Sequence, residues 1–200
     1  MPVKPSSHRA RQAQATRHAV IAAARALFGE RGYTATTIEA ISEASGIPTQ
    51  TIYSAFGAKR AILEAIRVAW IDEAEVATSF GRAMAMPQLA DRLRTSAHWT
   101  RRQFELGHDV IATYQEASRA DPEAARVWAA ALAGRAVGIR RMIGGASGDL
   151  RPGLSRKRAV DVYIALTLAE AYRTLVLERG WTPDEFEEWL ARALVRELVG

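Results

Sequence analysis

Residues 37–59 read TIEAISEASGIPTQTIYSAFGAK, and this stretch decides the fold of the N-terminal third of the chain. The hydroxyl of Thr37 can accept a hydrogen bond from a first-turn backbone N–H, so it begins a helix that ends just before Gly46. Gly46 supplies the positive φ that a sharp turn requires. A second short helix runs to Phe56 from Pro48, which suits the first helical position because its missing N–H would be unpaired there. The spacing predicts a helix-turn-helix.

The side chains of the second short helix divide between two faces. Ile52 and Phe56 are four residues apart and therefore point together towards the core. Thr49, Gln50 and Tyr53 point elsewhere and are free to contact a ligand. The second helix of a helix-turn-helix enters the major groove of DNA, so this face predicts double-stranded DNA as a partner.

Upstream of this stretch, an amphipathic helix is predicted over residues 16–31. Its apolar residues recur at helical spacing and Gly32 ends it: Val20, Ala23, Ala24, Leu27 and Phe28. Residues 1–15 hold Pro, Ser, Arg and Gln with little apolar content, which predicts a mobile basic arm. Such an arm can lie against DNA phosphates or in a minor groove.

Positive charge is confined to the first third of the chain. Residues 1–70 hold nine Lys or Arg and four Asp or Glu, whereas residues 71–200 hold eighteen of each kind. A basic region joined to a neutral one is typical of a polyanion-binding module attached to another domain. The alternative is a basic tail that only improves solubility.

The run FGERGYTATTIEAISEASGIPTQTIYSAFGAKRAILEAI, residues 28–66, resembles the N-terminal domain of the tetracycline-repressor (TetR) family of bacterial regulators. The residues that match the family pattern are Phe28, Gly32, Tyr33, Thr36, Thr37, Ile38, Ile41, Ala44, Gly46, Thr51, Ile52, Tyr53, Phe56, Lys59 and Leu63. Ser42, Ser45, Pro48 and Ala55 depart from it. The resemblance implies an all-α protein of about nine helices, with a three-helix DNA-binding domain and a C-terminal effector-binding and dimerisation domain. The expected boundaries are an arm over 1–15, the helix-turn-helix domain over 16–60 and the second domain over 61–200.

The DNA contacts that the resemblance implies lie on and around the recognition helix, at Thr37, Pro48, Thr49, Gln50, Thr51, Tyr53 and Lys59. Thr37, Tyr53 and Lys59 are expected to contact phosphates, which positions the domain without reading sequence. Base reading is expected from Thr49 and Gln50, because the N-terminal residues of a recognition helix lie deepest in the groove. The alternatives are a half-buried core aromatic for Tyr53 and a solvated charge for Lys59.

Residues 59–200 read as further helices separated by Gly and Pro. Continuous helices are predicted from Lys59 towards Phe80, over 88–106, over a shorter stretch ending near Ala120, over 122–142 and over 155–179. A last helix follows the capping box Thr182-Pro183-Asp184-Glu185. Residues 144–153, GGASGDLRPG, carry no phosphate-binding spacing and predict a flexible loop.

Two sets of residues in the second domain are candidates for binding. The TetR resemblance places an effector pocket there, and its candidate lining is aromatic-rich, which indicates a hydrophobic small molecule: Trp70, Phe80, Met84, Trp99, Phe104, His108, Tyr114 and Trp128. Apolar surface on the last two predicted helices indicates a homodimer. The residues expected in its interface are Val160, Ile164, Leu168, Tyr172, Leu175, Trp189 and Leu194. The alternatives are ordinary core for most of the first set and the core of a monomer for the second.

Composition excludes several classes of site. The chain has no cysteine, and its four histidines show no metal-ligand spacing, so we expect no metal or other cofactor. No pair of carboxylates or nucleophile with a base is suitably spaced, so an enzyme is not predicted. No export signal or membrane span is evident, and a cytoplasmic protein is expected.

The sequence therefore predicts a homodimeric repressor that binds a pseudo-palindromic operator and is released from it by a small-molecule effector. The alternative is a helical small-molecule-binding or enzymatic bundle in which the basic N-terminus is incidental. Binding to the protein's own upstream DNA discriminates the two.

Overall fold

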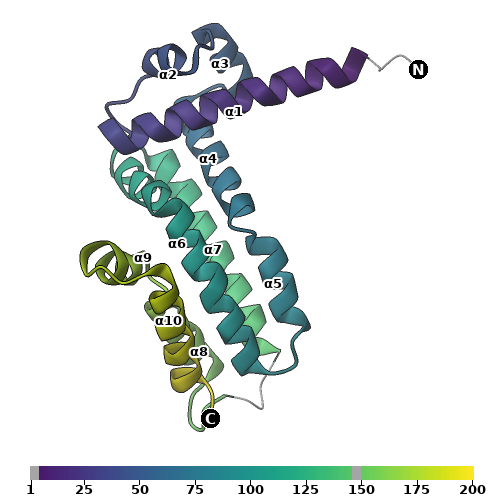
Figure 1. Cartoon of the computed structure of the whole chain (residues 1–200), viewed down its shortest axis with the longest axis vertical. Helices are drawn as coiled ribbons and strands as arrows, with labels where there is room; N and C mark the ends of the chain where they lie inside the picture. The colour runs from purple at the N-terminus through teal and green to yellow at the C-terminus, as the bar shows by residue number, and fades with distance from the viewer. Residues whose placement is uncertain (1–4, 146–149) are drawn as a thin grey trace. The chain divides into compact units, whose positions relative to one another are not determined.

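The structure, a computed structural model, describes residues 5–145 and 150–200 (Figure 1). Helices dominate this part of the chain, and its one extended pairing is an isolated bridge between Leu150 and Val199. The all-α prediction is confirmed. The chain forms two compact units, one comprising residues up to Ala69 together with Asp109–Arg126, the other Trp70–His108 with Val127–Gly200.

The first unit holds α1 (Pro5–Arg31), α2 (Ile38–Ser45), α3 (Thr49–Phe56) and most of α4 (Lys59–Glu73). As predicted, the Thr37 hydroxyl caps α2 by accepting from the Ala40 N–H at 3.1 Å, and Gly46 is left-handed with φ 68°. Ile41 and Ile52 from the two short helices are fully buried with residues of α1 and α4. The helix-turn-helix is therefore built as its local sequence predicts.

Pro48 differs from its prediction by one position. It is the N-cap of α3 and not the first helical residue, with φ −56° and an extended ψ of 141°. Its carbonyl accepts from the N–H groups of Thr51 and Ile52, which begins the helix without a capping side chain. The proline ring thus fixes the backbone φ of the residue that precedes α3, and the helix itself starts at Thr49.

α1 is longer than predicted. Residues 5–15, expected as a mobile arm, continue the helix, and residues 1–4 lie outside the described residues. No Gly or Pro occurs between Pro5 and Gly29, and the Ala, Arg and Gln of this stretch favour helix strongly. The low apolar content of residues 5–15 therefore belongs to an exposed end of α1 and not to a mobile arm.

The second unit begins at Trp70, within α4, and the predicted continuous helix towards Phe80 is wrong. Glu75 is left-handed with φ 52° and separates α4 from α5 (Val76–Ala85). Trp70 and Ala74 are buried four residues apart, but the next buried residue is Ser79, five residues on. The left-handed conformation of Glu75 lets α5 begin with a different face towards the core than α4 would have presented if it had continued.

α6 (Leu89–Ala120) and α7 (Pro122–Gly144) follow, and the predicted junction at Gly107 is a kink within α6 with φ −153°. A Cβ at Gly107 would lie 2.1 Å from Nε1 of Trp70, so only glycine fits there. Trp70 Nε1 donates to the carbonyl of Gln103 at 2.8 Å, one turn before the kink. The predicted start of α7 is confirmed, since Asp121 Oδ1 accepts from the N–H of Glu123 at 2.9 Å.

The predicted continuous helix over 155–179 is wrong. It is divided into α8 (Arg156–Leu166), α9 (Ala169–Tyr172) and a π-helical segment, η1 (Arg173–Glu178). The break lies at buried Thr167, whose carbonyl accepts from the Arg135 guanidinium at 2.9 Å and is thereby satisfied outside the helix. The predicted loop over 144–153 falls partly on residues 146–149, outside the described residues.

α10 (Pro183–Leu198) closes the chain and carries both hydrogen bonds of the predicted capping box between Thr182 and Glu185. Figure 1 shows α10 lying alongside α8. An aromatic cluster joins these last elements to α6, with ring centroids 5.6 Å apart for Phe104 and Tyr172 and 5.1 Å apart for Tyr172 and Phe186.

Candidate nucleic-acid interface

The recognition helix presents the predicted contact residues to solvent. Gln50, Thr51 and Tyr53 are exposed, whereas Ile52 between them is 1% exposed. Pro48 is exposed and Thr49 is half-buried at the start of the helix. Tyr53 is 48% exposed, so about half of its surface is accessible to a ligand. This face of α3 is therefore free to enter a groove of DNA.

Lys59 holds the segment that leads into α2. Its Nζ donates to the carbonyls of Tyr33 at 2.7 Å and Thr36 at 2.8 Å, and lies 4.3 Å from the centre of the Tyr33 ring. Burial is the main cause that lowers the pKa of Lys59. Lys59 is therefore not the solvated charge of the alternative reading, and sequence analysis missed this internal role. Its phosphate contact stays a prediction.

The turn between α1 and α2 is also held by a carboxylate from the far end of α6. Glu116 accepts from the backbone N–H groups of Tyr33 and Thr34, each at 3.0 Å. The hydrogen bond from Thr34 N–H is the main cause that lowers the pKa of Glu116. Gly32 has φ 83°, and a Cβ there would lie 2.9 Å from the Glu116 carboxylate oxygens. Nothing in the local sequence indicates this contact.

Two further polar contacts bind residues 109–126 into the first unit. Arg25 donates through Nε and Nη2 to both carboxylate oxygens of Asp109, at 2.7 and 2.8 Å. The Tyr114 hydroxyl donates to Glu64 at 2.8 Å, and Glu64 is paired in turn with Arg67. Desolvation raises the pKa of Tyr114 above its ordinary value. The first unit thus contains a segment that is distant from α1–α4 in sequence.

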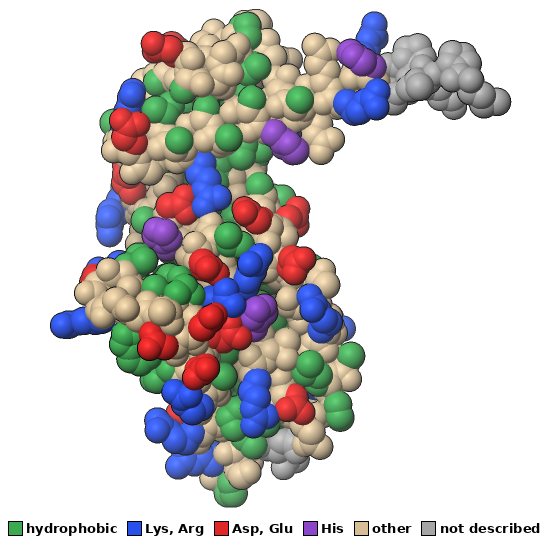
Figure 2. Space-filling view, in the orientation of Figure 1, with side chains coloured by type: hydrophobic (Ala, Val, Ile, Leu, Met, Phe, Trp, Pro, Cys, Tyr) green, Lys and Arg blue, Asp and Glu red, His purple; other side chains and the backbone are tan. Residues whose placement is uncertain are grey.

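A groove of about 470 Å³ lies between α1 and α3 in the same unit. It is lined by Arg9, Gln12, Ala13, Thr16, Arg17, Thr51, Ser54 and Ala55. Arg17 donates to the Ala55 carbonyl at 2.7 Å and stacks on the Phe56 ring at 4.3 Å, which fixes α1 against the end of α3. Figure 2 shows basic and His side chains along the start of α1. If the sequence analysis had predicted that α1 is helical from Pro5, the residues of α1 that line this groove would have been predicted to share one helical face.

The eight candidate effector residues differ in burial and are divided between the two units. Trp70, Trp99 and Phe104 are buried core of the second unit, Tyr114 is buried in the first, and His108 is exposed. The others, which remain half-buried and accessible, are Phe80, Met84 and Trp128. None of the eight lines the pocket along α10, the groove between α1 and α3 or the pocket around Ile143 and Val160. The effector site stays a prediction.

The candidate dimer residues differ in how much of their surface is accessible to a partner. Val160, Tyr172 and Leu194 are buried within the chain itself and present almost no surface to a partner. Leu168 is 45% exposed, and Leu177, which was not predicted, is 51% exposed. The half-buried remainder is Ile164, Leu175 and Trp189. The accessible members therefore lie on α8, η1 and α10 and at Leu168, the residue before α9.

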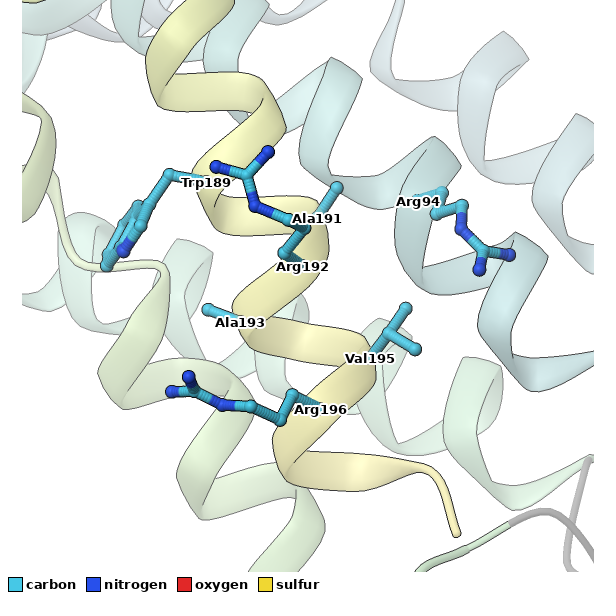
Figure 3. Close-up of a pocket in the computed structure, with 7 residues that line it drawn as sticks. All are labelled: Arg94, Trp189, Ala191, Arg192, Ala193, Val195 and Arg196. Carbon is cyan, nitrogen blue, oxygen red and sulfur yellow. The ribbon is translucent and has the colours of Figure 1, made fainter.

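A pocket of about 420 Å³ lies along α10, and Figure 3 shows its lining residues, which include Arg94 of α6. Trp189, Arg192 and Arg196 contribute to its lining from α10. Each arginine has an acidic neighbour within 4 Å, so the pocket holds no uncompensated cation.

Within the described ranges no cluster of three potential metal ligands occurs, and no helix is long and apolar enough to cross a membrane.

Comparison with known proteins gives one family and one fold. Residues 20–66 match the family described as bacterial regulatory proteins, tetR family. A comparison with curated protein sequences finds no significant match.

Solved structures similar to this chain cover nearly all of it. The fatty acid degradation regulator FadR from Bacillus halodurans is 14% identical, with a TM-score of 0.74 over 98% of this chain and 97% of that one. FadR from Bacillus subtilis in complex with stearoyl-CoA is 18% identical, with a TM-score of 0.69 over 90% and 98%. NalD, the secondary repressor of the MexAB-OprM multidrug efflux pump in Pseudomonas aeruginosa, is 20% identical, with a TM-score of 0.65 over 94% and 98%.

Proposed function

We propose that this chain, whose residues 20–66 match the tetR family of bacterial regulatory proteins, is a transcriptional repressor that a small-molecule effector releases from its operator. The observation that carries the proposal is the exposed face of α3, where Gln50, Thr51 and Tyr53 stand clear of the core around Ile52. A helix with this division of faces can place its N-terminal side chains on base edges while its other side stays anchored.

The expected roles differ along the helix. Gln50 can bond bidentately to adenine, and the Thr49 methyl can pack on the methyl of thymine. Thr37 and Tyr53 contact phosphates on either side, because both lie at exposed positions next to the recognition helix. A homodimer would present two such helices to successive major grooves of a pseudo-palindrome.

The effector is expected to be hydrophobic. FadR from Bacillus subtilis was solved with stearoyl-CoA, and NalD is described as a repressor, which supports both parts of the proposal by analogy. Half-buried Phe80, Met84 and Trp128 offer apolar contact surface in the second unit. Effector binding would then shift the population away from the conformation that fits DNA.

The test is a gel shift of the purified protein with fragments of its own upstream DNA at low salt. The proposal expects a discrete shifted band that unlabelled fragment removes and unrelated DNA does not. Failure to shift any of these fragments would instead favour the helical bundle with an incidental basic N-terminus. A panel of acyl-CoA compounds added to the complex tests release separately.

A further inference from the structure

We propose that the groove between α1 and α3 binds a phosphate of the DNA backbone, so that the first turns of α1 belong to the DNA-contacting surface. This rests on the proposed function, because it assigns a further contact of the same interface. The residues concerned are Arg9, Gln12 and Thr16 on one wall and Thr51 and Ser54 on the other.

The α1 wall is a single helical face. Arg9, Gln12, Ala13, Thr16 and Arg17 follow the spacing i, i+3, i+4, i+7 and i+8, so their side chains point the same way. This face exists only because α1 is helical from Pro5, well before the amphipathic stretch that packs on the core. The N-terminal part of α1, which does not pack on the core, is therefore the part that lines the groove.

The chemistry of the lining suits an anion. Besides Arg17, which already donates to the Ala55 carbonyl, the lining has a guanidinium, a carboxamide and three hydroxyls that can donate hydrogen bonds to phosphate oxygens, and no acidic residue lines the groove. The first acidic residue of the chain is Glu30, and α3 carries no charge, so nothing on either helix nearby opposes a negative ligand. Among the described residues, Arg9 has no hydrogen-bond or ion-pair partner.

Position argues for DNA as the source of the phosphate. Thr51 and Ser54 flank Tyr53 on the recognition helix, so the groove continues the surface already proposed to meet the duplex. Arg17 holds the two walls together through the Ala55 carbonyl and the Phe56 ring, which fixes the groove before any ligand arrives. A preformed site of this kind positions the protein on the backbone without reading bases.

The test compares Arg9→Ala with Arg11→Ala in the full-length protein, using the upstream DNA fragment and measuring affinity by fluorescence anisotropy across salt concentrations. Both substitutions remove one exposed cation from the same helix. Two residues along a helix correspond to roughly 200° of rotation, so Arg11 faces away from the groove. Arg9→Ala should reduce the slope of log K against log salt by about 0.9 and weaken binding about two- to tenfold, with Arg11→Ala close to wild type.

A second variant probes the opposite wall. Ser54→Asp introduces a negative charge from α3 and should also weaken binding, with the preference between operator and unrelated DNA unchanged, because a phosphate contact carries no sequence information. Circular dichroism of each variant checks that the helices are intact.

The outcomes separate this inference from the proposed function. If the wild-type protein binds no upstream fragment, the proposed function itself fails. If the wild type binds and Arg9→Ala keeps the same salt slope, or Arg11→Ala loses as much, only the groove assignment is overturned. Saturable binding of inorganic phosphate that depends on Arg9 and does not compete with DNA would also overturn it, by reassigning the groove to a free anion.

Discussion

Single residues of the first unit serve the recognition helix in two ways. Some, such as Gln50, are exposed and available to DNA, whereas Lys59 points inward and bonds to the Tyr33 and Thr36 carbonyls. Exposed side chains affect affinity or specificity alone, while internal ones also affect stability. The two kinds are therefore separable by experiment.

Gln50→Ala should relax specificity at one or two base pairs, because loss of a bidentate contact removes about 1–3 kcal/mol of discrimination against the wrong base. Competition binding against operator variants with single base changes measures this. Gln14→Ala, an exposed glutamine of α1 outside the groove, is the control. Equal loss of affinity on every sequence would show that Gln50 contacts the backbone.

Lys59→Ala should lower the free energy of unfolding by about 1–3 kcal/mol, because two carbonyls lose a charged donor. It should also reduce the salt slope of DNA binding by about one if Lys59 contacts a phosphate as predicted. Urea unfolding checks the first effect and anisotropy the second. Arg60→Ala, at the adjacent exposed position, is the matched control, and similar stability loss in both would contradict the internal role.

At the scale of elements, the parts of α6 before and after the kink at Gly107 pack in different units. Residues before the kink pack in the second unit, where Trp70 bonds to Gln103, and residues after it belong to the first unit through Asp109 and Glu116. The kink and these polar contacts are thus expected to be sensitive positions.

Gly107→Ala should destabilise the protein by about 1–3 kcal/mol, since the added methyl group would overlap the Trp70 indole. Gly29→Ala is the opposite case within a helix, because a Cβ there has no neighbour within 4 Å. It should stabilise by about 0.5–1 kcal/mol through helix propensity. Thermal unfolding followed by circular dichroism compares them, and a neutral Gly107→Ala would show that the indole can move aside.

The contribution of Glu116 should depend on pH. Its pKa in the folded protein lies below the ordinary value of 4.5, so its stabilisation is fully present above that pH and is lost as pH falls through the folded pKa. Glu116→Gln should therefore lower the melting temperature at pH 7, and the difference from wild type should shrink in acid. Glu43→Gln, an exposed glutamate of α2, is the control. A difference that is constant with pH would contradict the charge-based contact.

At the scale of the whole molecule, the proposed dimer depends on exposed apolar surface at Leu168, just before α9, and at Leu177 of η1. Leu168→Glu combined with Leu177→Glu should convert a dimer to a monomer, because these side chains are 45% and 51% exposed in the single chain. Sedimentation equilibrium reports the mass. Leu132→Glu on α7 is also at a 45% exposed leucine outside this surface and should leave the dimer intact. A wild-type monomer, or dissociation by the α7 variant alone, would contradict the proposal.

The sequence by itself determined the features whose causes are local. Thr37 capping α2, Gly46 turning the chain and the capping box before α10 each depend on atoms within a few residues, so residue type and spacing predict them. The division of α3 into a buried Ile52 and exposed neighbours follows from helical period in the same way.

Only the tertiary structure decided which distant groups meet. Glu116 accepts from the Tyr33 N–H across 83 residues, the Thr167 carbonyl accepts from Arg135 where α8 ends, and the C-terminal part of α6 from Asp109 belongs to the first unit. Buried polar groups must be satisfied by whatever partner packing brings near them, and spacing along the chain does not encode that partner. The same reason explains why the groove beside α3 was not predicted.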